Sequence, residues 1–555
     1  MVTTVVNEQA ARPGTFAPLK EQGPFRRIWI ASIFSNFSQL FLGVGAAWEM
    51  TKLSNSPSMV ALVQTAMMLP LMIVTLPAGA IADMFDKRKI ALSGLGFSAL
   101  SAAALTLVSS AGMITPWLLL AFCVLIGAGV ALFSPSWQAS IPEQVSRENL
   151  PSAVALGTIS YNVARSFGPA LGGLIVLAAG ATAVFGLTTV FYAPLLFAFF
   201  MWKRNHVPSR LPPERIDRAI VGGGRYALNA PAIRTALVRV FLFGLMSATA
   251  GALAPLIAKD MLGGDAAIFG MLLGAQGIGA VCGALFVGKI RERFSTEWAI
   301  RIFAVGSGLS IIVIGLSHSV PLSCLAFAVI GVSNILTIAM LNVTVQMSAP
   351  RWVSARALSL FASAITAGIG IGAWGWGALA TSHGVSFAFV ASGLAVIATI
   401  LFGFAFPLSR DAEVDISEVG LNNEPNVAMP LTLRSGPIMI ALDYDVDPDK
   451  AREFYGAMMD LQGVRKRNGG FNWSLSRDVE NLAIWTEHFY CPTWGDYLRM
   501  RARYSQTDTE IQAEADSFNR SGRRVRRRLV RPFGSVRWKA DSPDPYHDTV
   551  GYIGP

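Results

Sequence analysis

The chain has 555 residues, of which 53% are hydrophobic and only 14% are charged, and its formal net charge is +10. Soluble globular proteins carry about 25% charged residues, so this composition excludes that class and indicates a membrane protein. The apolar residues form blocks of about 20 to 25, the length of a helix that crosses a hydrocarbon core of about 30 Å. A membrane β-barrel would instead alternate polar and apolar residues, so we predict an all-α membrane protein.

A polar tail, residues 1–24, precedes the first apolar block. That block is long and lacks a small-residue cleavage site at its end, so we expect no cleavable signal peptide. Three of the four cysteines fall within apolar blocks, and Cys491 stands alone. This spacing predicts neither a disulfide framework nor a zinc site, and we expect the cysteines to fill the core.

Twelve apolar blocks follow the tail. A polar segment, residues 203–232, divides them into two six-helix halves, residues 25–202 and 233–407. The predicted spans are 25–48, 57–82, 89–110, 116–140, 150–178, 181–202, 233–258, 266–288, 297–317, 321–348, 354–380 and 385–407.

Basic residues are distributed unequally between the two sets of loops. The loops on the side of the N-terminus contain eighteen Lys and Arg residues, against only Lys52 and Lys259 on the other side. The positive-inside rule therefore places both termini and the central segment in the cytoplasm. This placement also explains the basic net charge without nucleic-acid binding.

The two halves have similar sequences in the same direction. LIGAGV at 125–130 corresponds to VIGVSN at 329–334, and IPEQVSREN at 141–149 corresponds to APRWVSARA at 349–357. Two halves with parallel topology imply a pseudo-two-fold axis along the membrane normal, with a pathway between the halves.

The loop after the second span reads GAIADMFDKRKIAL, residues 79–92. Three consecutive basic residues, Lys87, Arg88 and Lys89, would anchor a loop on an anionic inner leaflet. Anchoring does not account for Asp83, because the positive-inside rule requires no acid there.

Gly79, Asp83 and the basic run resemble the loop signature of the major facilitator superfamily, G-x-x-x-D-x-x-x-K/R-R-K. The resemblance implies the major facilitator fold and an inner gate in which the acid and the basic residues hold the halves together in the outward-open state. Met84 and Asp86 occupy positions where Arg and Gly are common. In the second half, Val287 replaces the acid of the signature.

The fifth span contains GTISYNVARSFGPALGG, residues 157–173. Its glycines permit close approach of a neighbouring backbone, and Pro169 removes a helical hydrogen bond. The tail Gly168, Pro169, Gly172 and Gly173 resembles the signature of drug/proton antiporters, which implies export. Small-residue packing is also common in helices that transport nothing.

Arg165 lies near the predicted bilayer midplane, where an arginine costs about 2.5–3.5 kcal/mol on insertion scales. We expect it either to bond carbonyls freed by Pro169 or to attract an anionic substrate group or tune a proton site. Other polar residues within spans are candidate cavity lining or helix-to-helix hydrogen bonds: Asn36, Gln39, Gln64, Gln138, Asn162, Gln276, Asn334, Asn342 and Gln346.

Glu49 is the acid most favourably placed to carry a proton, although solvation at the membrane interface explains it as well. No G-x-x-x-x-G-K-[ST] motif occurs, so we expect an ion gradient to supply the energy. No cofactor is predicted.

After the last span, residues 408–435 are polar and contain prolines and asparagines, as a linker does. Residues 436–540 then change character, and residues 541–555 form a tail. PIMIALDYDV alternates as a half-buried strand does, and Asp447 with Pro448 marks the start of a helix with Phe454 and Met458 on its apolar face.

Further strands are predicted at 471–477, 482–490 and 529–538, with a helix at 493–519 between the last two. This β-α-β-β-α-β order predicts a small α+β ferredoxin-like domain. It resembles dimeric α/β-barrel domains related to antibiotic-biosynthesis monooxygenases, which implies self-association. Residues 465–478 with Trp485 and Glu487 resemble the extension of enterobactin-exporter-like transporters.

The domain shows no Ser/His/Asp arrangement or metal-ligand spacing, so we expect it to bind or dimerise and not to catalyse. The arginines at 523–531 are typical of a nucleic-acid surface, but beside a membrane they favour anionic lipid.

Together these features predict an inner-membrane exporter of a small organic molecule, such as a siderophore or an antibiotic, that works by proton antiport and alternating access. A proton-coupled importer and a membrane-tethered sensor with the C-terminal domain as its output are the alternatives.

Overall fold

The computed structural model describes residues 16–20, 23–84, 86–146, 148–203, 224–408, 425, 427–429, 431–522 and 524–530. It divides into two compact units. The first is helical and comprises residues 1–216, 237–342 and 359–408. The second comprises the C-terminal domain with residues 217–236 and 343–358.

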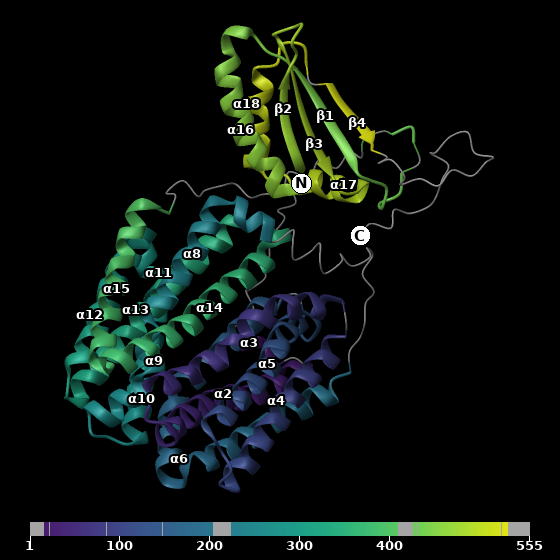
Figure 1. Ribbon diagram of the computed structural model, residues 1–555. Coiled ribbons are helices and arrows are strands. Elements are labelled where there is room, and N and C mark those ends of the chain that lie inside the picture. The colour runs from purple at the N-terminus through teal and green to yellow at the C-terminus, as the bar shows by residue number, and fades with distance from the viewer. Residues whose placement is uncertain are drawn as a thin grey trace, which may run out of the picture. The chain divides into compact units, whose positions relative to one another are not determined.

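The first half of the helical unit follows the predicted spans closely (Figure 1). Its elements are α1 (Ala17–Lys20), α2 (Phe25–Leu53), α3 (Pro57–Met84), α4 (Lys87–Ser110), α5 (Pro116–Ser140), the 3-10 helix η1 (Ile141–Glu143) and α6 (Leu150–Met201). Polar caps fix several starts: the Thr115 side chain accepts the backbone N–H of Leu118 at the start of α5.

Helix α6 is 52 residues long and contains the fifth and sixth predicted spans. Gly180 interrupts it with a φ of +80° and a ψ of 170°, values far from helical. A left-handed φ of this kind favours glycine, so the chain reverses where the sequence predicts the boundary between two spans.

The second half begins with a helix broken into short pieces. Its elements are α8 (Pro231–Ser247), α9 (Thr249–Ala252), α10 (Ala254–Leu256), the π-helix η2 (Ile257–Met261), α11 (Ala266–Arg293), α12 (Thr296–Leu316), α13 (Val320–Ser348), α14 (Arg351–His383) and α15 (Val385–Ala405). Pro255 accounts for the break at Leu253, because proline removes a helical hydrogen bond. The remaining helices agree with the predicted spans to within three residues at either end, except that α11 continues five residues beyond the predicted end at 288.

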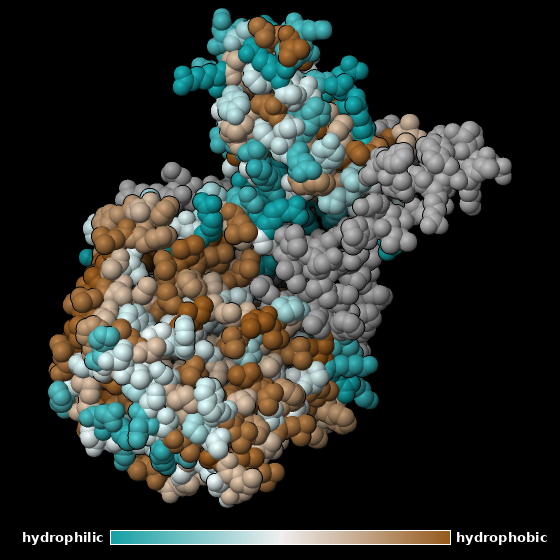
Figure 2. Space-filling view, viewed as in Figure 1, coloured by the Kyte–Doolittle hydropathy of each residue, from teal (hydrophilic) through white to brown (hydrophobic). Residues whose placement is uncertain are grey.

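Apolar side chains cover much of the visible face of the helical unit (Figure 2). Leu100, Leu285 and Leu401 are each at least 70% exposed. Within the described residues, eleven helices are long and apolar enough to cross a membrane, and one of these is the 50-residue stretch from Ser152 to Met201. The protein is therefore a multi-pass membrane protein.

The C-terminal domain is a four-stranded antiparallel sheet with helices on one face (Figure 1). Its elements are β1 (Ile438–Asp445), the 3-10 helix η3 (Pro448–Lys450), α16 (Ala451–Asn468), β2 (Phe471–Arg477), β3 (Ile484–Cys491), α17 (Trp494–Ala502), α18 (Gln506–Ser517) and β4 (Arg524–Leu529). The spatial order is β2-β3-β1-β4, so the predicted β-α-β-β-α-β arrangement is present.

Two details of the predicted domain are wrong. The helix expected at 493–519 is two helices, because the Ser505 side chain and Asp508 form a capping box that starts α18. The last strand begins at Arg524 and not at 529. The residues predicted beyond 530 lie outside the described part of the chain.

The face of the sheet away from the helices is polar. Asp443 on β1 accepts hydrogen bonds from Thr486 on β3 (3.0 Å) and from Arg526 on β4 (2.6 Å). An antiparallel sheet commonly has one packed and one solvated face, and this distribution matches that pattern.

All four cysteines are free. Cys123 and Cys491 are buried and Cys324 is partly buried, so the expectation of core filling holds for these. Burial raises the pKa of Cys491 to about 12. The expectation is wrong for Cys282, whose side chain is exposed on the surface of α11.

Candidate functional site

Helix α6 carries a polar stripe in its first half. Thr158, Asn162 and Arg165 follow one another at spacings of four and three residues, so they share one face of the helix. The opposite face is apolar and exposed at Phe167 (56%) and Leu174 (52%). The stripe therefore faces away from the surface that lipid would cover.

Small residues pack against a helix of the same half on one side of this stripe. A Cβ added at Gly168 would lie 3.0 Å from the side chain of Leu40 on α2. A Cβ at Gly172 would lie 3.3 Å from the ring of Phe41. The glycines thus allow α2 to lie directly against α6.

Small residues on the other side of the stripe pack against a helix of the second half. A Cβ at Gly270 of α11 would lie 2.8 Å from the carbonyl oxygen of Pro169. A Cβ at Gly277 would lie 2.6 Å from the carbonyl oxygen of Arg165. Gly173 meets the backbone of α11 in the same way. The polar stripe therefore lies between α2 of one half and α11 of the other.

Arg165 is half-buried and has no hydrogen bond or ion pair with any residue that the structure describes. The bond to carbonyls freed by Pro169, which was the structural alternative, is not formed in this part of the chain. An unpaired arginine within a span needs water or an anion as a partner. The role of Arg165 in the pathway stays a prediction.

The other predicted pathway residues have varied environments. The Asn36 amide donates to the Ser160 hydroxyl at 2.9 Å, so it joins α2 to α6. Glu49 pairs with Lys52 at 3.5 Å. Of the remaining candidates, Gln138 and Gln346 are exposed. The others are half-buried: Gln39, Gln64, Gln276, Asn334 and Asn342.

The basic run of the predicted gate makes contacts within the first half. Lys87 pairs with Glu143 at 2.8 Å, and Arg88 donates to the carbonyl oxygen of Phe199 at 3.0 Å. Lys89 is exposed. Asp86 caps α4 by accepting the backbone N–H of Arg88 at 2.9 Å, which gives a structural reason for its departure from the loop signature.

Gly79 and Asp83 belong to the last turns of α3. The side chain of Asp83 and the surroundings of Gly79 lie outside the described part of the chain, so the acid of the gate stays a prediction.

Hydrogen bonds join the two halves where α3 begins and α14 ends. The hydroxyls of Ser58 and Thr381 lie 2.7 Å apart. The Thr65 hydroxyl donates to the carbonyl oxygen of Gly370 at 2.8 Å. At the end of α2, the Thr51 carbonyl oxygen accepts from Lys259 at 2.9 Å.

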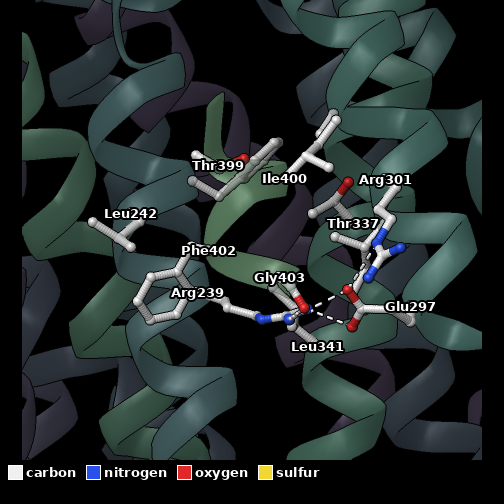
Figure 3. Close-up of a pocket in the computed structure, with 13 residues that line it drawn as sticks. Arg239, Leu242, Glu297, Arg301, Thr337, Leu341, Thr399, Ile400, Phe402 and Gly403 are labelled. Atoms are coloured by element: carbon white, nitrogen blue, oxygen red, sulfur yellow. Dashed lines mark hydrogen bonds and ion pairs between the residues drawn. The ribbon is translucent and has the colours of Figure 1, made fainter. Parts of the chain in front are cut away.

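The second half contains a buried charged cluster that sequence reasoning missed (Figure 3). Arg239 of α8 donates to both carboxylate oxygens of Glu297 on α12, at 2.7 and 3.3 Å. Arg301, one turn further along α12, donates to the same carboxylate at 3.1 Å.

The eighteen basic residues assigned to the loops include Arg239 and Arg301, although both also fall within the predicted spans 233–258 and 297–317. The structure places both within helices, and Arg239 is only 8% exposed. Glu297 and Arg301 are four residues apart, a spacing that predicts an ion pair on one helix face. That spacing was a signal by which two members of the cluster could have been found, but nothing local to α12 indicated Arg239.

No group of His, Cys, Asp or Glu side chains in the described ranges is arranged to hold a metal ion.

Similar proteins include membrane transporters. The family model for transmembrane secretion effectors matches residues 13–532. The multidrug efflux pump Tap of Mycolicibacterium fortuitum is 25% identical over 407 residues, which cover 72% of this chain and 98% of Tap. The enterobactin exporter EntS of Shigella boydii is 28% identical over 378 residues, which cover 64% of this chain and 85% of EntS.

Solved transporters share the fold. A bacterial homologue of the lysosomal transporter Spinster in an inward-facing, unoccupied conformation has a TM-score of 0.56 and 11% identity, over 69% of this chain and 94% of that one. A variant of the nucleoside transporter NupG gives the same TM-score and identity, over 69% of this chain and all of the other.

The family match covers nearly the whole chain, and the relatives compared are transporters and not enzymes. The chain is therefore a major facilitator superfamily protein of the transmembrane secretion effector family.

Proposed function

We propose that the protein exports a small organic molecule across the cell's inner membrane by proton antiport, with the two halves exposing a shared cavity to each side in turn. The observation that carries this proposal is the unpaired Arg165 on the polar stripe of α6, between helices of opposite halves. Export is favoured by the names of Tap and EntS and by the antiporter-type run from Gly168 to Gly173.

We infer twelve crossings, because Gly180 divides α6 into two segments that are each long enough to span a bilayer. With the basic loops inside, both termini lie in the cytoplasm. In this topology the predicted gate, Asp83 with Lys87, Arg88 and Lys89, lies on the inner side and closes when the outer side opens.

The substrate class follows from Arg165. A guanidinium prefers a planar anionic group such as a carboxylate and binds it through paired hydrogen bonds. We therefore propose a molecule with an anionic group on an otherwise apolar or aromatic body, as many siderophores and some antibiotics have. Protons move in the direction opposite to the substrate, and the predicted proton carrier is Glu49, near the end of α2.

The test uses everted membrane vesicles in which respiration has built a proton gradient reported by an acridine dye. Adding a transported anionic compound should release protons and restore the fluorescence with wild-type protein. Arg165→Ala should lose this response, because the substrate anion loses its partner, and Arg165→Lys should keep part of it. Arg27→Ala removes an exposed arginine of α2 and serves as the control.

Equal responses from wild type and Arg165→Ala would contradict the role of Arg165. Accumulation of the compound inside right-side-out vesicles under an inward proton gradient would contradict export and support the importer.

A second candidate function, regulation by the C-terminal domain, rests on a contact within the second unit. Residues 224–229 form a short helix directly before α8. Arg225 of this helix donates to the carbonyl oxygen of Gly469, at the end of α16, at 3.2 Å. Burial raises the pKa of Tyr226, with Arg467 and Asp508 as the nearby charges. The domain thus holds the segment that leads into a membrane helix.

If this contact regulates transport, the double variant Arg225→Ala, Tyr226→Ala should change the transport rate while the domain stays folded. The rate is measured in the vesicle assay, and hydrogen exchange of β1 reports folding. Leu228→Ala alters an exposed residue of the same short helix and should change neither. An unaltered rate in the double variant would remove this candidate. Self-association of the domain stays a prediction.

A further inference from the structure

The charged cluster of the second half lies at the ends of membrane helices. Glu297 is the second residue of α12, which begins at Thr296, and Arg239 donates to the carbonyl oxygens of Gly403 (3.2 Å) and Phe406 (2.6 Å) at the end of α15. Helix ends in a membrane protein lie near the bilayer surface, so the cluster lies at the level of lipid head groups.

The cluster has a net positive charge, because two arginines surround one glutamate. The carboxylate oxygens of Glu297 already accept hydrogen bonds from both arginines and from the backbone N–H of Leu408 (3.4 Å). The partial positive charge at the start of α12 adds to this potential. A ligand of the cluster would therefore be an anion.

Several hydrogen-bond donors of the cluster are unused. The Nε atom of Arg239 and the hydroxyl of Thr337 are buried and have no partner among the described residues. Arg239 is 8% exposed and Thr337 is 1% exposed, and both line the same cavity (Figure 3). In the described part of the chain, the terminal nitrogens of Arg301 likewise donate to no group. A buried donor without a partner costs about 1–3 kcal/mol, so these groups favour an acceptor in the cavity.

The size of the cavity decides which anion fits. It measures about 30 Å³, which is room for about two water molecules. This volume excludes the transported organic molecule but admits one or two oxygens of a phosphate whose remainder lies outside.

Exposed aromatic side chains flank Arg301, which is one of the residues that line the cavity. Arg301 packs over the ring of Phe404, with 3.9 Å from its guanidinium carbon to the ring centroid, and also lies near the Trp298 ring. Phe404 is 64% exposed and Trp298 is 55% exposed. Aromatic side chains of this kind gather at membrane interfaces, and basic pockets between helices bind anionic head groups.

We propose that Arg239, Arg301 and Thr337 form a binding site for a phosphate group, supplied by an anionic phospholipid head group or by free inorganic phosphate. The bound phosphate completes the hydrogen bonds of Arg239, Arg301 and Thr337 and thereby joins α8, α12 and α13. The proposal does not depend on the direction of transport or on the substrate.

The test compares unfolding temperatures of the full-length protein in nanodiscs. One arm compares phosphatidylcholine discs with discs that also contain phosphatidylglycerol. The other arm adds inorganic phosphate to phosphatidylcholine discs at constant ionic strength. A ligand that binds only the folded state raises the unfolding temperature. Arg301→Gln should lose this shift, whereas Arg293→Gln, which changes an exposed arginine at the end of α11, should keep it.

A shift with phosphatidylglycerol alone that Arg301→Gln loses assigns the site to lipid. A shift with phosphate alone that the variant loses assigns it to the free ion. If neither addition shifts wild type, or if Arg301→Gln shifts as much as wild type, the proposal is overturned. Should Arg301→Gln fail to fold, Thr337→Val removes one unused donor, leaves the ion pairs intact and should reduce the shift.

Discussion

Glu487 is fully buried in the C-terminal domain, and four donors surround its carboxylate. Arg465 donates to its two oxygens at 2.9 and 3.1 Å, the Trp473 indole donates at 2.9 Å and the Tyr444 hydroxyl at 3.2 Å. A buried ion pair is expensive to form, but it is still more expensive to break by removing one partner. The pair therefore holds α16 against the sheet only while both charges are present.

We predict that Glu487→Gln destabilises the domain by about 3–5 kcal/mol, because Arg465 then stays buried without a counter-charge. Hydrogen exchange of β1 and β3 in the full-length protein measures the loss. Glu514→Gln changes an exposed acid on α18 and should have an effect within about 0.5 kcal/mol. Equal exchange in the two variants would contradict the role of the pair.

Single residues differ in how far the sequence predicts their roles. Arg165 is a candidate from sequence because a cation within an apolar block is costly wherever the chain folds. Asp86 appears in the sequence as a departure from a signature, and its role as the cap of α4 is visible only from its bond to Arg88. Arg239 falls within the predicted span 233–258, but its bonds to Glu297 on α12 and to Phe406 after α15 are visible only in the structure.

At the scale of elements, the contact between α6 and α11 is a seam of small residues between the two halves. Gly173, Gly270 and Gly277 each meet backbone atoms of the facing helix. Such a seam allows two helices to lie close without interlocking side chains, which suits helices that move relative to one another.

Gly173→Ala should destabilise the protein by about 1–3 kcal/mol, the usual cost of overpacking, and should slow transport. Gly157 lies on the same helix, and a Cβ added there would meet no atom within 4 Å. Gly157→Ala should therefore be neutral or slightly stabilising, because alanine is the better helix former. Thermal unfolding and the vesicle assay measure the two effects. Unchanged stability and transport in Gly173→Ala would show that the seam tolerates a methyl group.

In each half, an arginine from another helix donates a hydrogen bond to a carbonyl oxygen at the end of the last helix. Arg88 donates to the carbonyl oxygen of Phe199 near the end of α6, and Arg239 donates to that of Phe406 after α15. A cation there satisfies carbonyls that the helix leaves free and matches the helix dipole. The two arginines come from different helices of their halves, so sequence comparison of the halves did not pair them.

At the scale of the whole molecule, the bonds between α3 and α14 join the halves at one end. The Ser58 hydroxyl contacts the hydroxyl of Thr381 at 2.7 Å and the carbonyl oxygen of Gly377 at 3.1 Å. Alternating access requires the halves to separate at each end in turn. If the protein works by the proposed alternating access, these contacts break during the cycle.

A disulfide between Ser58→Cys and Thr381→Cys should stop transport, and a reducing agent should restore it. The matched control is Ser109→Cys with Thr182→Cys, whose parent hydroxyls also lie 2.7 Å apart but within one half. Cross-linking this pair should leave transport intact. Full transport by the cross-linked Ser58–Thr381 pair would mean that this end of the two halves does not open.

The sequence by itself determined that the chain is a membrane protein, where its apolar helices lie, and that a small α+β domain follows them. These features are local, because about 20 consecutive apolar residues are needed to cross a bilayer and a strand or cap is encoded by its neighbours. Tertiary structure alone decided which polar residues acquire partners. Arg239 and Glu297 are 58 positions apart, and Arg225 and Gly469 are 244 apart. No local pattern encodes such pairs, because they form only when packing brings distant helices and the C-terminal domain's segments together.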